Sequence, residues 1–282
     1  MEYLMLSKPL ENLSYSELAD TVADLGMDGV DLTVRSPGHV LPERVKTDLP
    51  KAAQDIRSRG LEIGWLTTAI ESAQSQYADD ILATASDLGI KQFKLGYYRY
   101  AGFGAMRRQI AEVREQLRGI EALCRKHGIQ AGVHAHDGPA LSATTHVVSL
   151  LLEGFDPAAL CYYPDLGHIG IEGSFGGWIH GLDLLSDRIN MLALENLAQF
   201  QEADPETGRM SWRPKVVPFD QGFIPFPEAF QYLKQIGYTG YASFQAEYRG
   251  ANSFKDMNQQ ELLAQVKQDL QYTKQLAGEV GL

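Results

Sequence analysis

Cysteine is scarce in this chain, and so are long apolar runs and clusters of basic residues. The 282 residues include only Cys124 and Cys161, which are far apart and form neither a disulfide framework nor a Cys-x-x-Cys metal site. We therefore expect two buried thiols. No apolar run approaches the roughly 20 residues that a membrane-spanning helix needs, and residues 1–6 lack the basic start of a signal peptide. These absences predict a cytoplasmic protein with no membrane partner.

The charge balance argues against a nucleic-acid partner. The formal net charge is -11, with 36 acidic residues against 25 basic ones. Surfaces that bind nucleic acids are basic instead. At 44% hydrophobic and 22% charged residues, the composition fits a globular protein with a sizeable core. We expect residues 1–282 to form a single domain.

Short apolar segments alternate with longer amphipathic ones along the whole chain. The short segments predict strands at 3–7, 29–35, 61–68, 91–98, 129–136, 160–165, 189–195 and 241–247. The amphipathic segments predict helices, the first capped by Ser14 or Ser16 and ended by Gly26, the others near 50–59, 76–88, 105–127, 143–152, 178–185, 227–236 and 259–276. Residues 196–224 are rich in proline and glycine, and we expect a long loop that covers one end of the fold.

This alternation indicates right-handed βαβ units and a parallel sheet. Eight such units in this length fit a closed (β/α)8 barrel, the TIM barrel. A doubly wound open sheet is the alternative. The nucleotide-binding form of that alternative is weakened, because neither a GxGxxG nor a GxxxxGK[ST] motif follows the first strand.

One stretch, residues 161–168, is the centre of the expected site. Side chains alternate between the two faces of a strand, so Cys161, Tyr163 and Asp165 share a face, with Asp165 at the carboxyl end. We expect Gly167 to turn the chain and His168 to return to the same place. An acid and an imidazole with this spacing can serve a metal or a polar substrate.

In a (β/α)8 barrel the active site lies at the carboxyl ends of the strands. The expected strand ends carry polar side chains, and Trp65 offers an aromatic wall for a sugar. The residues are Arg35, His134, His136, Asp165, His168, Glu195, Gln245 and Glu247. Burying such charges without a partner or a ligand is costly, so we expect a functional site. Structural imidazoles and salt bridges with arginine or lysine are the alternatives.

Four segments make the chain resemble a known family. They are LGMDGVDL at residues 25–32, DLGH at 165–168, VPFDQGFIPF at 217–226 and IGYTGYASF at 236–244. With them the chain resembles, over nearly its whole length, the sugar phosphate isomerase/epimerase family of xylose isomerase-like barrels. That group includes ketose 3-epimerases, inosose dehydratases and endonuclease IV. The multi-metal ligand set and basic groove of an endonuclease are not visible here.

The resemblance implies one divalent metal, often manganese, held by Glu, Asp, His and Glu on strands five to eight. Only Asp165 stands in strict register with that pattern. His134 takes the first Glu position, Ala193 the His position and Gln245 the last Glu position, with Glu247 two residues on. A rebuilt site would use His134, Asp165, Glu195 and Glu247. Such ligands suit manganese, zinc, iron or magnesium; a member that has lost its metal is the alternative.

The resemblance also implies the chemistry and the partner. Isomerising or epimerising a sugar moves a proton on a carbon next to a carbonyl, which needs a base at that carbon and an electrophile at the oxygen. We expect Glu247 as one acid/base group and His134 or Glu195 as the other. The expected substrate contacts are His168, His136, Arg35, Gln245 and Trp65.

Three hypotheses about function stay open. The first is a carbohydrate isomerase or epimerase, and the second a lyase or dehydratase acting on a keto-sugar or cyclitol through the same enolate. The third is a non-catalytic descendant that binds a sugar or a partner protein. The expected partner is a small-molecule carbohydrate, and a homo-oligomer is compatible with the family, whose members are often dimers or tetramers.

Overall fold

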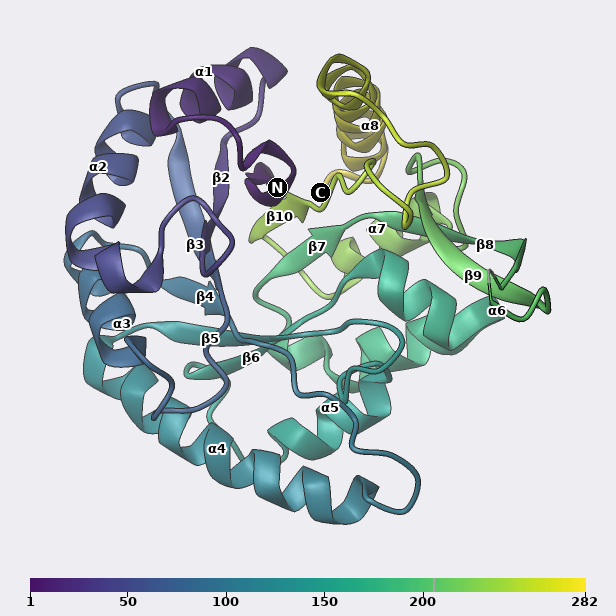
Figure 1. Ribbon diagram of the computed structural model, residues 1–282, viewed down its shortest axis with the longest axis horizontal. Coiled ribbons are helices and arrows are strands. Elements are labelled where there is room, and N and C mark those ends of the chain that lie inside the picture. The colour runs from purple at the N-terminus through teal and green to yellow at the C-terminus, as the bar shows by residue number, and fades with distance from the viewer. Residues whose placement is uncertain (205) are drawn as a thin grey trace.

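Eight parallel strands form the sheet at the centre of the molecule (Figure 1). In the computed structural model, which describes residues 1–204 and 206–282, they lie in the order β6-β5-β4-β3-β2-β1-β10-β7. Parallel bridges from Tyr162 to Ile189 and from Asp165 to Ala193 join the two edges of this sheet and nearly close it. The strands are β1 (Glu2–Leu6), β2 (Gly29–Val34), β3 (Glu62–Thr68), β4 (Gln92–Lys94), β5 (Gln130–His134), β6 (Leu160–Tyr163), β7 (Leu192–Leu194) and β10 (Tyr241–Phe244).

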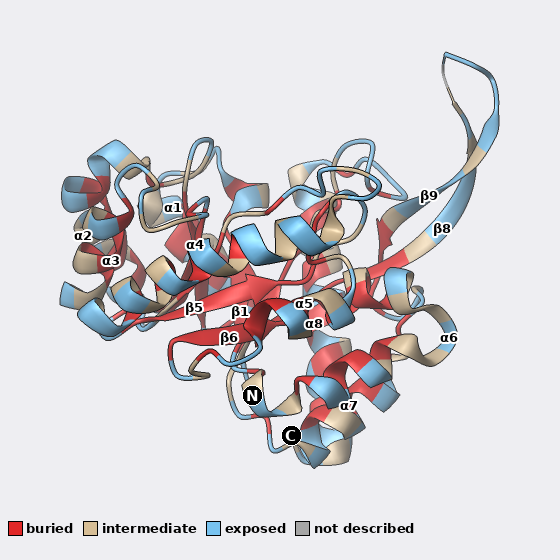
Figure 2. Ribbon diagram, turned by 90° about the horizontal axis from the view of Figure 1, so that it is seen from below, coloured by how far each residue is buried: buried red, intermediate tan, exposed pale blue. Residues whose placement is uncertain are grey.

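The sheet confirms the predicted (β/α)8 TIM barrel. The doubly wound open sheet is wrong, because the edge strands of that fold stay apart, whereas β6 and β7 meet here. Helices lie around the outside of the sheet (Figure 1), and Figure 2 shows buried strands inside helices whose outer faces are exposed. The helices are α1 (Tyr15–Leu25), α2 (Val45–Arg57), α3 (Ala78–Asp87), α4 (Met106–His127), α5 (Thr145–Leu152), α6 (Leu166–Leu184), α7 (Phe226–Gln235) and α8 (Gln259–Val280).

Local signals set several helix ends where the sequence predicts them. Ser14 caps α1 in a capping box with Glu17, so two backbone N–H groups that the helix leaves free are satisfied. Gly26 and Gly128 end α1 and α4 with φ of 79° and 62°, a conformation that glycine adopts without strain. Both cysteines are buried and free, as expected. None of the described helices is long and apolar enough to cross a membrane.

The inside of the barrel is filled by a small cluster of side chains separate from the main core. It consists of Leu4, Trp65, Cys161, Tyr163, Met191 and Ala193. This cluster is closely packed. A Cβ on Gly132 would lie 2.5 Å from the Met191 sulfur, and one on Gly64 would lie 2.3 Å from a Leu4 methyl group. The expected alternation of β6 is confirmed, because Cys161 and Tyr163 point inward while Tyr162 packs in the outer core. This packed layer forms the floor of the site.

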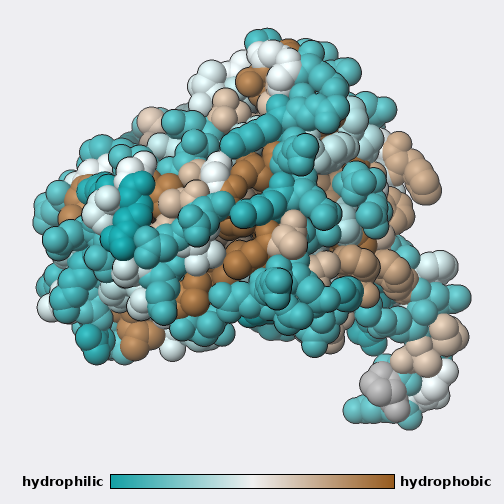
Figure 3. All heavy atoms as spheres, turned by 90° about the horizontal axis from the view of Figure 1, so that it is seen from above, coloured by the Kyte–Doolittle hydropathy of each residue, from teal (hydrophilic) through white to brown (hydrophobic). Residues whose placement is uncertain are grey.

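The expected long loop at 196–224 is wrong for most of its length. Its first part is an antiparallel hairpin of β8 (Asn196–Ala203) and β9 (Met210–Val217), whose far end stands clear of the barrel in Figures 2 and 3. Pro214, which suggests a loop, is tolerated because β9 is an edge strand in this two-stranded ribbon. Asn196 fixes the base: its amide donates to the carbonyls of Phe219 and Ile224 at 2.8 and 2.9 Å.

Two helices begin earlier than predicted. The helix expected at 178–185 is confirmed as the second part of α6. The expected turn at Gly167 is wrong, since α6 starts at Leu166 and bends at Ser174 and Gly176, which have non-helical backbone angles. Gly167 is helical, and it is small because a Cβ there would lie 2.8 Å from the Glu195 side chain. The helix α2 begins at Val45 and contains Pro50. The carbonyl that this proline leaves unbonded belongs to exposed Lys46, where water can reach it.

Candidate active site

A cavity of about 420 Å³ opens at the carboxyl ends of the barrel strands. Most of the sequence-predicted site residues line it: Arg35, His134, His136, Asp165, His168, Glu195, Gln245 and Glu247. Trp65 is not among the described lining residues. It is fully buried in the barrel interior, with its ring 5.2 Å from that of Tyr163. The barrel therefore brings side chains from distant parts of the chain to one place, as the strand-end pattern predicts.

Asp165 links the helix α6 to the cavity. It is fully buried, and its Oδ1 accepts hydrogen bonds from the backbone N–H groups of Gly167 at 3.0 Å and His168 at 3.3 Å, which caps the helix. Its Oδ2 lies 3.4 Å from His134 Nε2 and has no hydrogen-bond partner in the described part of the chain. One carboxylate oxygen is thus used by the fold, and the other is free for a ligand.

His168 lies between two carboxylates. Its Nε2 is 3.1 Å from Glu195 Oε1, and its Nδ1 is 3.3 Å from Asp137 Oδ1. Glu195 directly follows β7 and is 3% exposed. The α6 cap sets where His168 stands, because this residue is in the first turn after Asp165. The imidazole therefore joins the loop after β5 to the end of β7.

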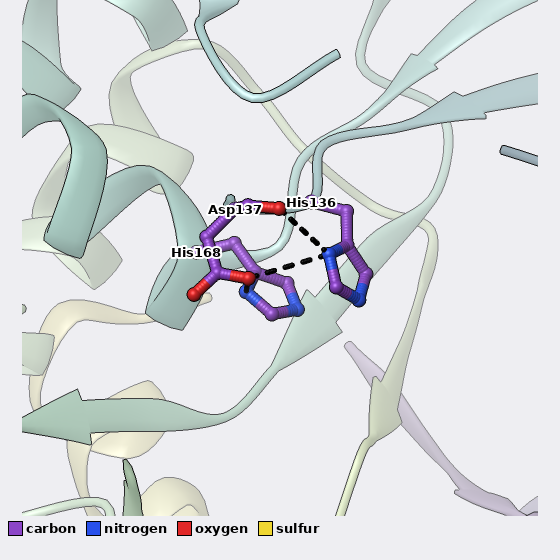
Figure 4. A group of neighbouring side chains, drawn as sticks. All are labelled: His136, Asp137 and His168. Atoms are coloured by element: carbon purple, nitrogen blue, oxygen red, sulfur yellow. Dashed lines mark hydrogen bonds and ion pairs between the residues drawn. The ribbon is translucent and has the colours of Figure 1, made fainter. Parts of the chain in front are cut away.

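His136 and Asp137 extend this cluster towards the cavity mouth. Figure 4 shows the Asp137 carboxylate against both imidazoles: Oδ1 is 3.3 Å from His136 Nδ1 and 3.3 Å from His168 Nδ1. The rings of His136 and His168 stack with their centroids 4.1 Å apart. An acid that contacts the Nδ1 atoms of both stacked imidazoles fixes the orientation of the two rings.

His134 is the most enclosed imidazole of the site. It ends β5, its ring lies 4.4 Å from the Tyr163 ring, and its Nδ1 is 2.9 Å from the Tyr97 hydroxyl. Its Nε2 faces Asp165 and is without a hydrogen bond among the described residues. Tyr97 thus holds one nitrogen of the ring and leaves the other directed at the cluster.

Burial and charge move the pKa values of these groups in different directions. Burial lowers the pKa of His134 to about 3, so this imidazole is neutral. Burial also acts to lower the pKa of His168, but the carboxylates of Asp165 and Glu195 outweigh it and raise the pKa to about 10. Burial and the charge of Asp165 raise the pKa of Glu195 well above its ordinary value. Groups with displaced and opposed pKa values are typical of sites that move protons.

The donor set fits a divalent cation. Ligand atoms of Asp165, His168 and Glu195 all lie within 4.8 Å of one another, and so do those of a second group, His136, Asp137 and His168. Within the described chain, Asp165 Oδ2, Glu195 Oε1 and His134 Nε2 are buried without a hydrogen bond. Leaving such atoms unpaired is costly, and a cation in the first group would satisfy the two carboxylate oxygens. His134 belongs to neither group, so its assignment as a metal ligand stays a prediction. The residues present therefore fit a metal.

Gln245 and Glu247 follow the end of β10 and line the cavity. Both Glu247 oxygens accept from Lys8 Nζ, at 2.7 and 2.8 Å. The Gln245 amide donates to Ser243 at 2.9 Å and approaches the Tyr163 hydroxyl at 3.3 Å. Glu247 lines the cavity, but it belongs to neither cation-binding group found among the described residues. Its assignment as a metal ligand stays a prediction.

Sequence reasoning missed several residues of the cavity wall, among them Asp137, Lys8 and Arg213. Asp137 directly follows His136, so its position after a strand end was a usable signal; Lys8 likewise follows the first strand. Arg213 comes from the hairpin, and only the hairpin's fold brings it to the cavity. A local sequence pattern carries no information about how the hairpin brings Arg213 to the cavity.

A comparison with protein families decides the family. The model of the xylose isomerase-like TIM barrel matches residues 19–276. The chain belongs to this family. The resemblance that the four sequence segments indicated is confirmed.

Solved structures agree with this xylose isomerase-like fold. D-psicose 3-epimerase with D-tagatose from Clostridium cellulolyticum H10 has a TM-score of 0.72 at 14% identity, covering 98% of this chain and 99% of that one. The probable 3-DHS dehydratase AsbF from Bacillus anthracis has 0.68 at 15% identity, covering 96% and 99%. A xylose isomerase-like TIM barrel protein from Mycobacterium smegmatis, in complex with magnesium, has 0.66 at 16% identity, covering 99% and 97%.

These likenesses show the shared fold and leave the reaction open. Among curated proteins, none matches this sequence. The similar structures include sugar epimerases and a probable dehydratase, at 12–15% identity to this chain. The reaction must therefore be inferred from the side chains that line the cavity.

Proposed function

We propose that this protein is a carbohydrate isomerase or epimerase that moves a proton on a carbon next to a carbonyl, assisted by a divalent cation. The observation that carries the proposal is the cluster of Asp165, His168 and Glu195, in which an acid, an imidazole and an acid with opposed pKa values face one cavity. Such chemistry needs a base at the carbon and stabilisation of the enediolate oxygen. The cleft supplies groups for both needs.

Asp165 and Glu195 would hold the cation, with an imidazole nitrogen from His134 or His168. The supporting observation is that Asp165 Oδ2, Glu195 Oε1 and His134 Nε2 are buried and unbonded within the described chain. A bound cation would polarise the substrate carbonyl and stabilise the negative charge of the enediolate. Manganese is our first choice, with zinc, iron and magnesium as alternatives that accept the same oxygen and nitrogen ligands.

Glu247 would take the proton from the carbon. Lys8 contacts both of its oxygens, so the carboxylate is fixed in direction at the cavity wall. If His134 supplies the imidazole ligand, His168, whose pKa the carboxylates of Asp165 and Glu195 raise to about 10, can keep its proton and donate a hydrogen bond to a substrate oxygen. His136, Arg35 and Gln245 would contact the rest of the substrate.

Epimerisation also requires a second group that returns the proton from the other face of the carbon. His134 and Glu195 come from strands distant from Glu247 and are the candidates. His134 is neutral and could take the proton only if its Nε2 does not bind the cation, and its pKa of about 3 makes it a weak base. The raised pKa of Glu195 lets that residue hold a proton. We assign the return step to one of these two residues.

A dehydratase acting on a keto-sugar is the second candidate. His168 favours it, because a protonated imidazole in the cavity can give its proton to a leaving hydroxyl group. The first step, removal of a proton next to the carbonyl, is the same in both reactions. The two differ in whether the enolate is reprotonated or loses water.

Solvent deuterium incorporation tests the proposal. The protein is incubated with manganese and D-tagatose or D-fructose in D2O, and the sugars are analysed by mass spectrometry and NMR. We expect deuterium at the carbon next to the carbonyl; loss of water would identify the dehydratase. Glu247→Gln should slow incorporation by about 100-fold or more, the usual contribution of a positioned acid/base group.

Glu112→Gln is the matched control. Glu112 is also paired with a cation, Arg108 at 3.5 Å, but it lies on the exposed surface of α4. Its replacement should leave the exchange rate unchanged. If Glu247→Gln exchanges as fast as the native protein, Glu247 is not the base. If the native protein binds the sugars without exchange or loss of water, a non-catalytic binding role gains support.

A further inference from the structure

Three basic side chains occupy one sector of the cavity wall, away from the acidic cluster. Lys8 follows β1, Arg35 follows β2 and Lys94 ends β4, and all three line the cavity. Asp165 and Glu195 stand at the ends of β6 and β7, on the other side of the barrel in the strand order. The cavity thus has an acidic side suited to a cation and a basic side.

Lys94 is the unusual member of the basic side. It is only 2% exposed, and its Nζ has no hydrogen-bond partner within the described chain. The Nζ instead lies 3.4 Å from the centroid of the Tyr97 ring, a cation–π contact. Burial lowers the pKa of Lys94 well below its usual range, because a charged amine without a bonded anion is costly there. An orphaned buried donor that lines a cavity is placed to meet an anionic group of a ligand.

The neighbours of Lys94 do not supply the missing anion. Asp31 is the nearby carboxylate, but Thr67 donates to its Oδ1 at 2.7 Å and Ser243 to its Oδ2 at 2.9 Å. Glu247 is held by Lys8. Among the charged neighbours, Arg35, a second cation, acts most strongly on Lys94, and the ion pairs found in the described chain do not include the Arg35 side chain.

We propose that Lys94 and Arg35 bind a carboxylate or phosphate group of the substrate. The substrate class is then an anionic sugar derivative, and this identification rests on the proposed function for its carbohydrate part. Lysine and arginine are the usual partners of both groups, and binding would give Lys94 Nζ a directly bonded anion, which the described chain does not supply.

The same ring contact places the anionic group close to the reacting carbons. The face of Tyr97 lies under Lys94, while the hydroxyl of the same ring is 2.9 Å from His134 Nδ1. A single phenol ring therefore separates the basic side from the acidic cluster. A sugar spanning the cavity would have its carbonyl at the cluster and its anionic group at Lys94.

Three ligands with one skeleton test this subsite by calorimetry in the presence of manganese: D-glucose, D-glucuronate and D-glucose 6-phosphate. We expect the native protein to bind one or both anionic ligands at least tenfold more tightly than glucose, and the better of the two tells carboxylate from phosphate. Lys94→Met should abolish the preference, and Arg35→Gln should reduce it. Lys91→Gln is the matched control, because Lys91 precedes the same strand but is exposed outside the cavity.

Folding and function are controlled separately. Lys94→Met removes an unpaired buried amine, so its melting temperature should equal or exceed the native value; Arg35, which is only half-buried, supplies the second variant. Equal binding of neutral and anionic ligands, or a preference that survives both substitutions, overturns the subsite. An anion preference that depends on Lys94 in a protein without deuterium exchange supports the subsite and contradicts the proposed function. Deuterium exchange on neutral sugars without any preference for anionic ligands supports the proposed function and contradicts the subsite.

Discussion

Asp269 provides a pH test of the packing that supports Glu247. This residue of α8 is 3% exposed; its Oδ2 accepts from the Tyr248 hydroxyl at 2.6 Å, and its Oδ1 from the Phe219 backbone N–H at 3.2 Å. It therefore joins the segment after β10 to the segment after β9. Burial raises its pKa from 3.8 to about 6, against the opposing effect of these hydrogen bonds.

The direction of the pH dependence follows from the raised pKa. The folded state holds the proton of the Asp269 carboxyl group more tightly than the unfolded state does. The stabilisation that this bound proton gives the folded state is therefore fully present below about pH 4 and is lost as the pH rises through 6. A rise of this size in the pKa of Asp269 corresponds to about 3 kcal/mol in the free energy of unfolding. Asp269→Asn removes the titration, so the variant should gain about 3 kcal/mol relative to the native protein between pH 4 and pH 7.

Urea denaturation followed by tryptophan fluorescence at intervals from pH 4 to pH 8 measures this difference. Taking the variant minus the native protein cancels the titration of the other groups. The reasoning is refuted if the difference is independent of pH, or if the variant loses stability relative to the native protein as the pH rises.

Two further substitutions test the barrel interior and the cation site. Gly132→Ala places a methyl group against the Met191 sulfur and should destabilise the protein by about 1–3 kcal/mol in the same urea assay. Gly177→Ala is the control, because this helical position has open space around it and the substitution should not destabilise the protein. Equal effects of the two substitutions would contradict the interior packing. Asp165→Asn keeps the Oδ1 acceptor that caps α6 but loses the charge facing the cavity. It should retain most of the native stability and bind manganese at least tenfold more weakly in calorimetry; native affinity would contradict the assignment.

Local patterns predict the part of the fold that local physics determines. The alternation of Cys161, Tyr162 and Tyr163 shows on the sequence because each side chain meets a different environment, inside or outside the barrel. The caps at Ser14 and Gly26 are visible for the same reason, since they satisfy neighbouring backbone groups. The strand order and the position of Asp165 at a strand end follow from these local elements.

Other features depend on contacts across the whole chain, and the sequence does not predict them. Glu247 meets Lys8, 239 positions away, only after the last strand pairs with the first. Gly167 resembles a turn residue, but the approach of Glu195 to α6 is what requires its small size. The hairpin after β7 was hidden by Pro214, which is acceptable only because its strand is an edge.

Anomalous X-ray scattering from crystals grown with manganese tests the central claim most directly. The account predicts a single strong peak bonded to Asp165 and Glu195, with an imidazole of His134 or His168 as a further ligand. Absence of density at Asp165, or a peak confined to His136 and Asp137 at the cavity mouth, would contradict it.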